Sequence, residues 1–519
     1  MRVLLLSMPD SFEHMTPVAI RMPNGALTSL AGNIDPHHDV ACADLLLVQG
    51  RVLPEVERLI RDRQPDVVGL SIMTFQRRTA LRLAGHIRRL RPSAAIVAGG
   101  YDPSLAPDAY EPAHTGVDFV VRGEGEITFR DLLRALEHGT PPHDRISRLA
   151  QIRGLSWRHA GKLRHNPDRP VLDLRRGELR LPKRGARVWR DYTLLGRPID
   201  VVETSRGCTF DCSFCSIVEM RGRNFHAFPI ERVLADIADA RDHGARSIFL
   251  VDDNITLDVR RFAQLCERII EAGLHTLDYS VQAMTSAIAQ HGATLAPLMR
   301  RAGFRYVFLG IENVLADDLQ FLRARAKNLR RGDRGEPAGN ASLEAIRLIH
   351  RHGMFVVGGL IVGNPDDTRE AIEANLAFAR RHVDWPYIQH PTPYPRTPMT
   401  REFREQGLIV SERLEEYDGT TAVVQTKHVP AEDVEFLRWR AERWMKVRHV
   451  PAALRHDPWF VLTHGGRMLA HTFRGCTWRT FAGLESPRAA FARYRAIRRA
   501  EREHVPEPRP ADEFAAASA

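Results

Sequence analysis

Short apolar runs alternate with helix-like patterns along the first 140 residues. The predicted strands are almost continuously apolar, as strands are when a sheet buries both of its faces. They cover Val3–Ser7, Val40–Leu47, Val67–Ser71, Ala95–Ala98 and Phe119–Val121, and the helices between them include Pro54–Arg63, Arg77–Leu90 and Glu126–His138. Strands that alternate with helices predict an α/β domain with a parallel, doubly wound sheet, whose ligands bind at the carboxyl ends of the strands.

The same alternation returns between residues 197 and 400. The predicted strands are Ile199–Glu203, Ser247–Val251, Leu277–Val281, Tyr306–Gly310, Val356–Val362 and Tyr387–His390. The predicted helices include Pro229–His243, Asp258–Ala272, Ala341–His352 and Asp366–His382. Repeated βα units predict a full or partial (β/α) barrel, in which chemistry takes place at the carboxyl ends of the strands.

The two remaining segments do not follow this pattern. Residues 141–196 are broken by prolines and read as a linker, with one hairpin over Gly154–Leu163. Residues 411–519 are helix-like and basic and hold Trp439, Trp444, Trp459 and Trp478. They fit an ordinary helical core, a lid or a surface-associating element, and the tail after Val505 is expected to be disordered. The predicted domains are therefore 1–140, a linker 141–196, a barrel 197–410 and a helical region 411–519.

Composition indicates a globular protein of several domains, with 519 residues, 44% hydrophobic and 27% charged. The apolar start Met1–Ser7 is ended by Pro9 and Asp10, so it predicts a buried strand and not a signal peptide. No apolar run approaches the roughly 18–20 residues of a membrane span. We therefore expect a cytoplasmic protein.

The formal net charge of +10 comes from basic residues scattered through helix-like segments, as in His86–Arg91. No basic run is interleaved with aromatic residues, which argues against specific nucleic-acid binding. An anionic membrane surface or an anionic substrate fits this charge better.

Three of the six cysteines, Cys208, Cys212 and Cys215, lie within eight residues, directly after a predicted strand. A disulfide framework is not expected from an odd number of cysteines in a reducing compartment. Three thiolates can hold a metal or an iron–sulfur cluster with one coordination position left open. The alternative is a structural zinc site completed by a distant residue, but the other cysteines are isolated.

The spacing C-x₃-C-x-Φ-C, with the aromatic Phe214 before the last cysteine, resembles the signature of the radical S-adenosylmethionine (radical SAM) family. The resemblance implies a partial barrel of that family's type. It also implies a [4Fe–4S] cluster on Cys208, Cys212 and Cys215, whose open iron binds the amino and carboxylate groups of S-adenosyl-L-methionine. Reduction then yields a 5′-deoxyadenosyl radical.

Polar and glycine residues at the predicted strand ends match that family in order. The resemblance implies contacts to the methionine amino group after the second strand, to ribose hydroxyls from Glu312, and to adenine from the backbone after the fifth strand. The expected cofactor-binding residues are Phe214, Asp252, Asp253, Asn254, Gln282, Glu312, Gly359 and Gly363. Residues 325–340 are expected to form an exposed charged loop and not a site.

Small residues also follow the strands of the first domain, where glycine lets a broad ligand approach the backbone. The runs at Gly99-Gly100 and Gly123-Glu124-Gly125 resemble the cobalamin-binding domain fused to many radical SAM enzymes, which has a flavodoxin-like sheet. The expected cofactor-binding residues are Ser71, Thr74, Gly99, Gly100, Gly123, Glu124 and Gly125. A nucleotide-binding or vestigial flavodoxin-like domain is the alternative.

The first domain lacks the D-x-H-x-x-G ligand motif of that family. Its nearest match, Asp35-Pro-His37, lacks the glycine and precedes the second strand, so His37 and His38 are expected to lie in a solvated turn. We therefore expect cobalamin without a histidine ligand from this domain.

These resemblances imply a cobalamin-dependent radical SAM enzyme that methylates an unactivated carbon. A radical SAM oxidative cyclase or rearrangement enzyme is the alternative, and a non-enzymatic iron–sulfur sensor is the alternative from another class. The expected partners are a small-molecule or lipid-like substrate, an external electron donor and a peripheral membrane contact. No individual catalytic residue is predicted.

Overall fold

The computed structural model describes residues 1–137, 141–331, 337–448, 450–456 and 458–506. The chain divides into two compact units. Unit 1 contains Met1–Ser11, Pro23–Asp191 and the residues from Glu501 onward, and unit 2 contains Phe12–Met22 and Tyr192–Ala500. The chain therefore enters each unit more than once.

Unit 1 is built on one sheet with the strand order β3-β1-β4-β5-β6-β7-β8. The first five strands are parallel: β3 (Asp39–Asp44), β1 (Arg2–Ser7), β4 (Val67–Ser71), β5 (Ala95–Gly99) and β6 (Phe119–Val121). They form the doubly wound parallel sheet that the sequence predicts. The chain order of these five strands across the sheet, second-first-third-fourth-fifth, is that of flavodoxin-like folds.

Both faces of this sheet are buried, which explains the unbroken apolar runs. Along β1, Leu4 and Leu6 pack into one core, with residues of α2 (Val52–Arg63) and α3 (Arg77–Leu90). The alternate residues of β1, Val3 and Leu5, pack into the core on the opposite face, with α1 (Gly25–Asn33) and α5 (Gly125–Leu136). Side chains of a strand alternate between the two faces of a sheet, so each face requires its own apolar set.

The segment 141–196, predicted to be a linker, contains more regular structure than that prediction gave it. After α6 (Pro142–Gln151), the strands β7 (Leu155–His159) and β8 (Lys162–His165) form the predicted hairpin. Its turn places Ala160 and Gly161 at positive φ. Because β7 pairs with β6, residues 155–165 extend the sheet of unit 1.

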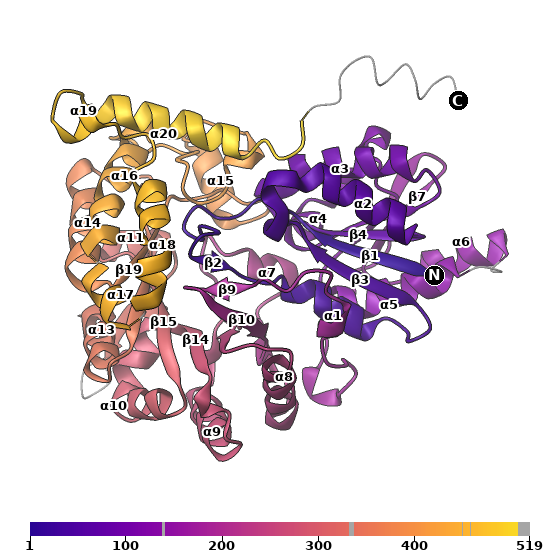
Figure 1. The fold of residues 1–519 in the computed structure, drawn as a ribbon, viewed down its shortest axis with the longest axis horizontal. Coiled ribbons are helices and arrows are strands. Elements are labelled where there is room, and N and C mark those ends of the chain that lie inside the picture. Colours follow the sequence, from indigo (N-terminus) through magenta and orange to yellow (C-terminus); the bar gives the residue numbers. More distant parts are fainter. Residues whose placement is uncertain (138–140, 332–336, 449, 457, 507–519) are drawn as a thin grey trace. The chain divides into compact units, whose positions relative to one another are not determined.

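Unit 2 is built on an eight-stranded sheet with the order β19-β18-β15-β14-β13-β10-β9-β2. Six parallel strands correspond to the six predicted ones: β10 (Arg197–Val202), β13 (Ser247–Leu250), β14 (Asp278–Met284), β15 (Phe304–Glu312), β18 (Phe355–Ile361) and β19 (Trp385–Gln389). Helices α8 (Ile230–Asp242), α9 (Val259–Glu271) and α10 (Thr285–Arg301) lie outside these strands (Figure 1). The sheet is an open, partial barrel, since its two edge strands, β19 and β2, do not pair with each other.

One edge of the unit 2 sheet is completed by a segment from the start of the chain. Strand β2 (Ile20–Arg21) pairs with β9 (Thr193–Leu194), which pairs with β10. In the same segment, the Glu13 carboxylate accepts hydrogen bonds from Arg474 and lies 3.4 Å from Arg498 Nε. Burial would raise the pKa of Glu13, but Arg498 and Arg474 outweigh it and hold that pKa well below its usual range.

The C-terminal part of unit 2 is helical, as predicted, with α16 (Ala431–Arg448), α17 (Val450–His456), α18 (Pro458–Thr472), α19 (Trp478–Phe481) and α20 (Pro487–Glu501). Its core joins Trp439 of α16 to Phe491 and Tyr494 of α20. From residue 507 on, the tail predicted to be disordered lies outside the described residues. Among the described helices, none combines the length and the apolar character that crossing a bilayer would demand.

The fold itself accounts for Gly100, one of the glycines predicted to contact a cofactor. Its φ is +103°, and a Cβ at this position would lie 2.9 Å from both the nitrogen and the oxygen of Ile72. A side chain would therefore strain the backbone whether or not a ligand is bound.

We predict that Gly100→Ala lowers the stability of the full chain by about 1–3 kcal/mol, because alanine rarely adopts this φ. Gly85→Ala is the matched control, since Gly85 lies within α3 and has no atom within 4 Å of an added Cβ. Urea unfolding followed by circular dichroism measures both. Equal unfolding midpoints for the two variants would contradict the assigned backbone conformation.

Candidate active site

The three clustered cysteines lie in one loop of unit 2, between β11 (Ser205–Arg206) and α7 (Ser216–Arg221). The main-chain nitrogen of Cys215 donates to the carbonyl of Cys212 at 3.1 Å, which folds the loop back on itself. Gly207 enters the loop with a φ of +88°, and a Cβ there would lie 2.6 Å from the Asn224 carbonyl oxygen. Only glycine fits at the start of this loop.

Burial affects the ionisation of two of the cysteines, Cys212 and Cys215. Cys212 is buried, Cys215 is half-buried, and both are free thiols. Burial raises the pKa of Cys212 to about 11 and that of Cys215 to about 12. Thiols of this kind become thiolates at neutral pH only when a bound cation stabilises the charge. Three sulfur donors in one short loop thus fit a thiophilic metal centre.

Two adjacent aspartates after β13 hold the start of this loop. Asp252 is fully buried and accepts hydrogen bonds from the main-chain nitrogen and hydroxyl of Thr204 and from the Ser205 hydroxyl. Asp253 accepts from the main-chain nitrogen of Gly207 at 2.7 Å and pairs with Arg221 at 3.1 Å. These predicted cofactor residues thus anchor the cysteine loop. Despite the hydrogen bonds, burial raises the pKa of Asp252 to about 6.

Three further predicted residues lie within this loop, beside it or on the neighbouring strand. The Asn254 amide nitrogen lies 3.9 Å from the Cys208 sulfur and 3.8 Å from the Met284 sulfur, so its side chain is directed at the site. Gln282 is half-buried on β14, the strand beside β13. Phe214 is half-buried within the cysteine loop.

A buried ion pair stands at the end of β15. Glu312 has a φ of +58°, which is uncommon for a residue with a side chain, and its Oε1 lies 3.0 Å from Lys327 Nζ. A Cβ at Gly310 would lie 2.7 Å from that same oxygen, so glycine leaves room for the pair. Burial lowers the pKa of Lys327, but Glu312 and Cys212 outweigh it, and the pKa lies above its usual range.

Lys327 corrects the expectation that residues 325–340 form an exposed charged loop. The described part of this segment contains α12 (Arg325–Asn328), β16 (Leu329–Arg331) and β17 (Pro337–Asn340), and the Lys327 side chain is only 17% exposed. The sequence did not predict the burial of Lys327, because this lysine lies in a run of basic residues with Arg325 and Arg330 and nothing distinguishes it from them. The one available signal was Glu312, since a buried carboxylate at a strand end requires a positively charged partner.

The two predicted glycines of the fifth barrel strand, Gly359 within β18 (Phe355–Ile361) and Gly363 after it, also have roles within the fold. A Cβ at Gly359 would lie 2.8 Å from the Phe308 ring. Gly363 has a φ of +99°, and its main-chain nitrogen donates to Asp367 at 2.7 Å. Their role toward a cofactor stays a prediction.

The predicted residues of unit 1 gather at the carboxyl edge of its sheet. Ser71 and Gly99 are register partners at the ends of neighbouring strands, and Val121 ends the next strand. At Gly123, with a φ of +72°, an added Cβ would have no atom within 4 Å. The edge thus offers open backbone, which suits a broad, flat ligand.

Two of the predicted unit 1 residues have hydrogen-bond partners within the fold, and two others are placed by a turn and a helix start. Ser71 accepts a hydrogen bond from Asn24, and Glu124 accepts one from the main-chain nitrogen of Leu172. Thr74 is buried in the turn after β4, and Gly125 begins α5.

His37 and His38 precede β3, at the amino edge of the sheet and thus opposite these residues. Only His37 fits the predicted solvated turn, since His38 is 4% exposed. Their place on the far edge supports the prediction that neither ligates a cobalamin at the carboxyl edge.

Comparison with known families shows which families the two domains belong to and which cofactors they bind. Residues 14–133 match the B12 binding domain, and residues 202–379 match the radical SAM superfamily. The chain is a radical SAM enzyme with a B12-binding domain. This confirms the predicted family, the enzyme class and the cofactors, which are cobalamin, a [4Fe–4S] cluster and S-adenosylmethionine.

Individual proteins are similar to this chain over most of its length. An uncharacterized methyltransferase of Pyrococcus horikoshii is 28% identical over 92% of this chain and 98% of its own. An anaerobic magnesium-protoporphyrin IX monomethyl ester cyclase of Cereibacter sphaeroides is 25% identical over 84% of this chain and 67% of its own.

A solved structure confirms the fold. The radical S-adenosylmethionine methyltransferase TsrM from Kitasatospora setae, solved with cobalamin and a [4Fe–4S] cluster bound, superposes with a TM-score of 0.61. It is 20% identical, and the superposition covers 78% of each chain.

We predict that Lys327→Gln weakens binding of S-adenosylmethionine to the reconstituted enzyme by about tenfold or more, since Glu312 is left as a buried carboxylate without its cation. Arg325→Gln is the control, because Arg325 is exposed on the same short helix. Calorimetric titration under anaerobic conditions measures both affinities. An affinity for Lys327→Gln equal to that of the control would show that the pair does not contribute to the cofactor site.

Proposed function

We propose that this enzyme methylates an unactivated carbon of a small molecule. The observation that carries the proposal is the presence, in one chain, of a B12-binding domain and a three-cysteine loop within a radical SAM domain. The relative that is similar over 92% of the chain is named a methyltransferase. An unactivated carbon cannot attack a methyl sulfonium by a polar route, and the need for both cofactors follows from that substrate.

The cofactors supply the chemistry when bound: a radical that removes hydrogen from the substrate, and a methyl donor. We propose that Cys208, Cys212 and Cys215 hold the cluster, and that Asp252 and Asp253 fix their loop through the bonds to Thr204, Ser205 and Gly207. We assign the carboxyl edge of the unit 1 sheet, with Gly99 and Gly123, to cobalamin. A substitution at Gly99 tests this assignment better than one at Gly100, because the φ of Gly99 is ordinary and the atom nearest to an added Cβ lies 3.7 Å away.

An oxidative cyclase is the second candidate. The specific observation in its favour is the 25% identity, over 84% of the chain, to an enzyme named as a cyclase. Both reactions consume S-adenosylmethionine, but only methylation moves a methyl group onto the product.

We predict that the reconstituted enzyme transfers an intact CD₃ group from methyl-deuterated S-adenosylmethionine to a compound in an extract of small molecules. The physical reason is that methyl transfer keeps the three carbon–deuterium bonds. Mass spectrometry of the extract identifies the product, and the Cys212→Ala variant, which lacks one proposed cluster ligand, is the control. Cleavage of S-adenosylmethionine with a changed but unlabelled product would favour the cyclase instead.

We also propose an interaction partner for the C-terminal helices: an anionic membrane, where the enzyme would meet a lipid-like substrate. Large apolar side chains of this region stand in solvent: Trp459 is 77% exposed, Leu462 73% and Trp478 71%. Ring contacts of Phe473 with Trp444 and Phe481 join α16, the end of α18 and α19 into one apolar face.

The charge of the same stretch fits that partner. Residues 444–484 contain six lysines and arginines, one aspartate and no glutamate. Exposed tryptophan beside basic residues is the pattern of interfacial helices, which place apolar groups in the headgroup region and attract anionic lipids.

We predict that the full chain co-sediments with vesicles of phosphatidylcholine and phosphatidylserine, and less with phosphatidylcholine alone. Trp459→Ala together with Trp478→Ala should lower the bound fraction several-fold, since both side chains would insert in the interface. Ile497→Ala on α20, where Ile497 is 37% exposed, is the control. Equal binding of the double variant and the control would contradict the membrane contact. A dimer that the double variant dissociates would show that a second copy covers the face.

A further inference from the structure

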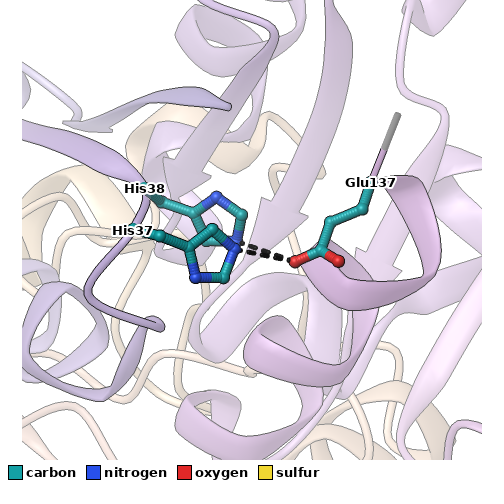
Figure 2. A group of neighbouring side chains, drawn as sticks. All are labelled: His37, His38 and Glu137. Carbon is teal, nitrogen blue, oxygen red and sulfur yellow. Dashed lines mark hydrogen bonds and ion pairs between the residues drawn. The ribbon is translucent and has the colours of Figure 1, made fainter. Parts of the chain in front are cut away.

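Two histidines and a glutamate meet at the amino edge of the unit 1 sheet, outside the sites described above. His37 and His38 lie in the turn before β3, and Glu137 follows the end of α5. Figure 2 shows both imidazole rings directed at the Glu137 carboxylate. The turn and the helix end are a hundred residues apart in the sequence, so only the fold brings the three side chains together.

The distances between these side chains suit one small cation. Nε2 of His37 lies 2.9 Å from Glu137 Oε1, and Nε2 of His38 lies 3.5 Å from the same oxygen. The ligand atoms of all three residues lie within 4.8 Å of one another. A tetrahedral Zn²⁺ with bonds of about 2.0–2.1 Å needs donor atoms about 3.3 Å apart, which is close to both measured separations.

The environment of His38 is separate evidence for a bound ligand. Its side chain is 1% exposed, yet within the described part of the chain its buried Nε2 has no hydrogen-bond partner. A buried polar atom without a partner is costly, and a bound cation would satisfy this nitrogen. Its other ring nitrogen, Nδ1, lies 3.2 Å from the Met1 nitrogen, and this contact holds the ring from its far side.

The charge state of His38 suits a ligand as well. Burial first, and then the nearby Met1 amino group and His37, lower the pKa of His38, which favours the neutral ring. Neutral imidazole is the form that binds metals. Two arginines that pair with Asp35, in the same turn, are Arg134, which bonds to it at 2.6 and 3.0 Å, and Arg180, which lies 3.6 Å from it.

We propose that His37, His38 and Glu137 bind a divalent transition cation of the Zn²⁺ type, distinct from the iron–sulfur and cobalamin cofactors. Two imidazoles and a carboxylate form a borderline donor set that suits Zn²⁺ and not Mg²⁺ or Ca²⁺, which require oxygen donors. A water completes the coordination on the exposed side of His37. The ion ties the turn before β3 to the end of α5 and so stabilises unit 1.

The test uses the untagged full chain with Cys208, Cys212 and Cys215 replaced by alanine, because zinc would otherwise occupy the thiolates. Zinc titration against a chromophoric chelator should show one tight equivalent per chain. His37→Ala and Glu137→Gln should each weaken that site at least tenfold, since each removes a ligand. His37→Ala cannot open the core, because the His37 side chain is 62% exposed.

His86→Gln is the matched control. His86 forms a histidine–carboxylate pair of similar length, 3.0 Å from Glu57, but does not belong to a group of three potential ligands in the described residues. In the protein with its cysteines intact and the cluster reconstituted, zinc should raise the unfolding temperature of the parent and of His86→Gln, but not of His37→Ala. Zinc affinities that are the same in His37→Ala, Glu137→Gln and the control, or no tight equivalent at all, would overturn the proposal.

Discussion

Thiolates in a buried loop have to be balanced by positive charge, and the residues around the cysteine loop of unit 2 reflect that constraint. Burial keeps Cys212 and Cys215 protonated unless a cation is bound, so the loop becomes a ligand set only together with its metal centre. The protein supplies the rest. Asp252 and Asp253, which follow β13, hold the start of the cysteine loop. Lys327 of α12 adds one largely buried positive charge, paired with Glu312 at the end of β15.

The parallel strands make this arrangement possible, because their carboxyl ends meet at one edge of the sheet. A short polar segment follows β13, and its side chains contact the segment that follows the adjacent strand, β10. Asp252 reaches back to Thr204 after β10, and Asn254 reaches Cys208. The anchoring bonds are therefore made between adjacent strands, which explains why acidic residues that resemble cofactor ligands also serve the fold.

Much of this could be predicted from the sequence, since periodicity and strand ends are local signals. The six barrel strands and the five strands of the first sheet were readable because buried strands are continuously apolar. Three features were not readable, and each depends on a long-range contact. Lys327 is largely buried beside Glu312, His38 is buried with Glu137 and Met1 as neighbours, and β2 is a two-residue strand with no pattern of its own. The assignment of single residues to cofactors stays a set of predictions.

The passage of residues 12–22 into unit 2 has a consequence for how this chain can be divided. A fragment cut between the two family domains would start at about Tyr192 and would leave behind β2, Glu13 and His14. Arg474 and Arg498 would lose the carboxylate that they share, and β9 would become an exposed sheet edge open to aggregation. The radical SAM domain is thus not a module that ends at its own sequence boundaries. A fragment meant to retain the whole of unit 2 therefore has to include residues 12–22.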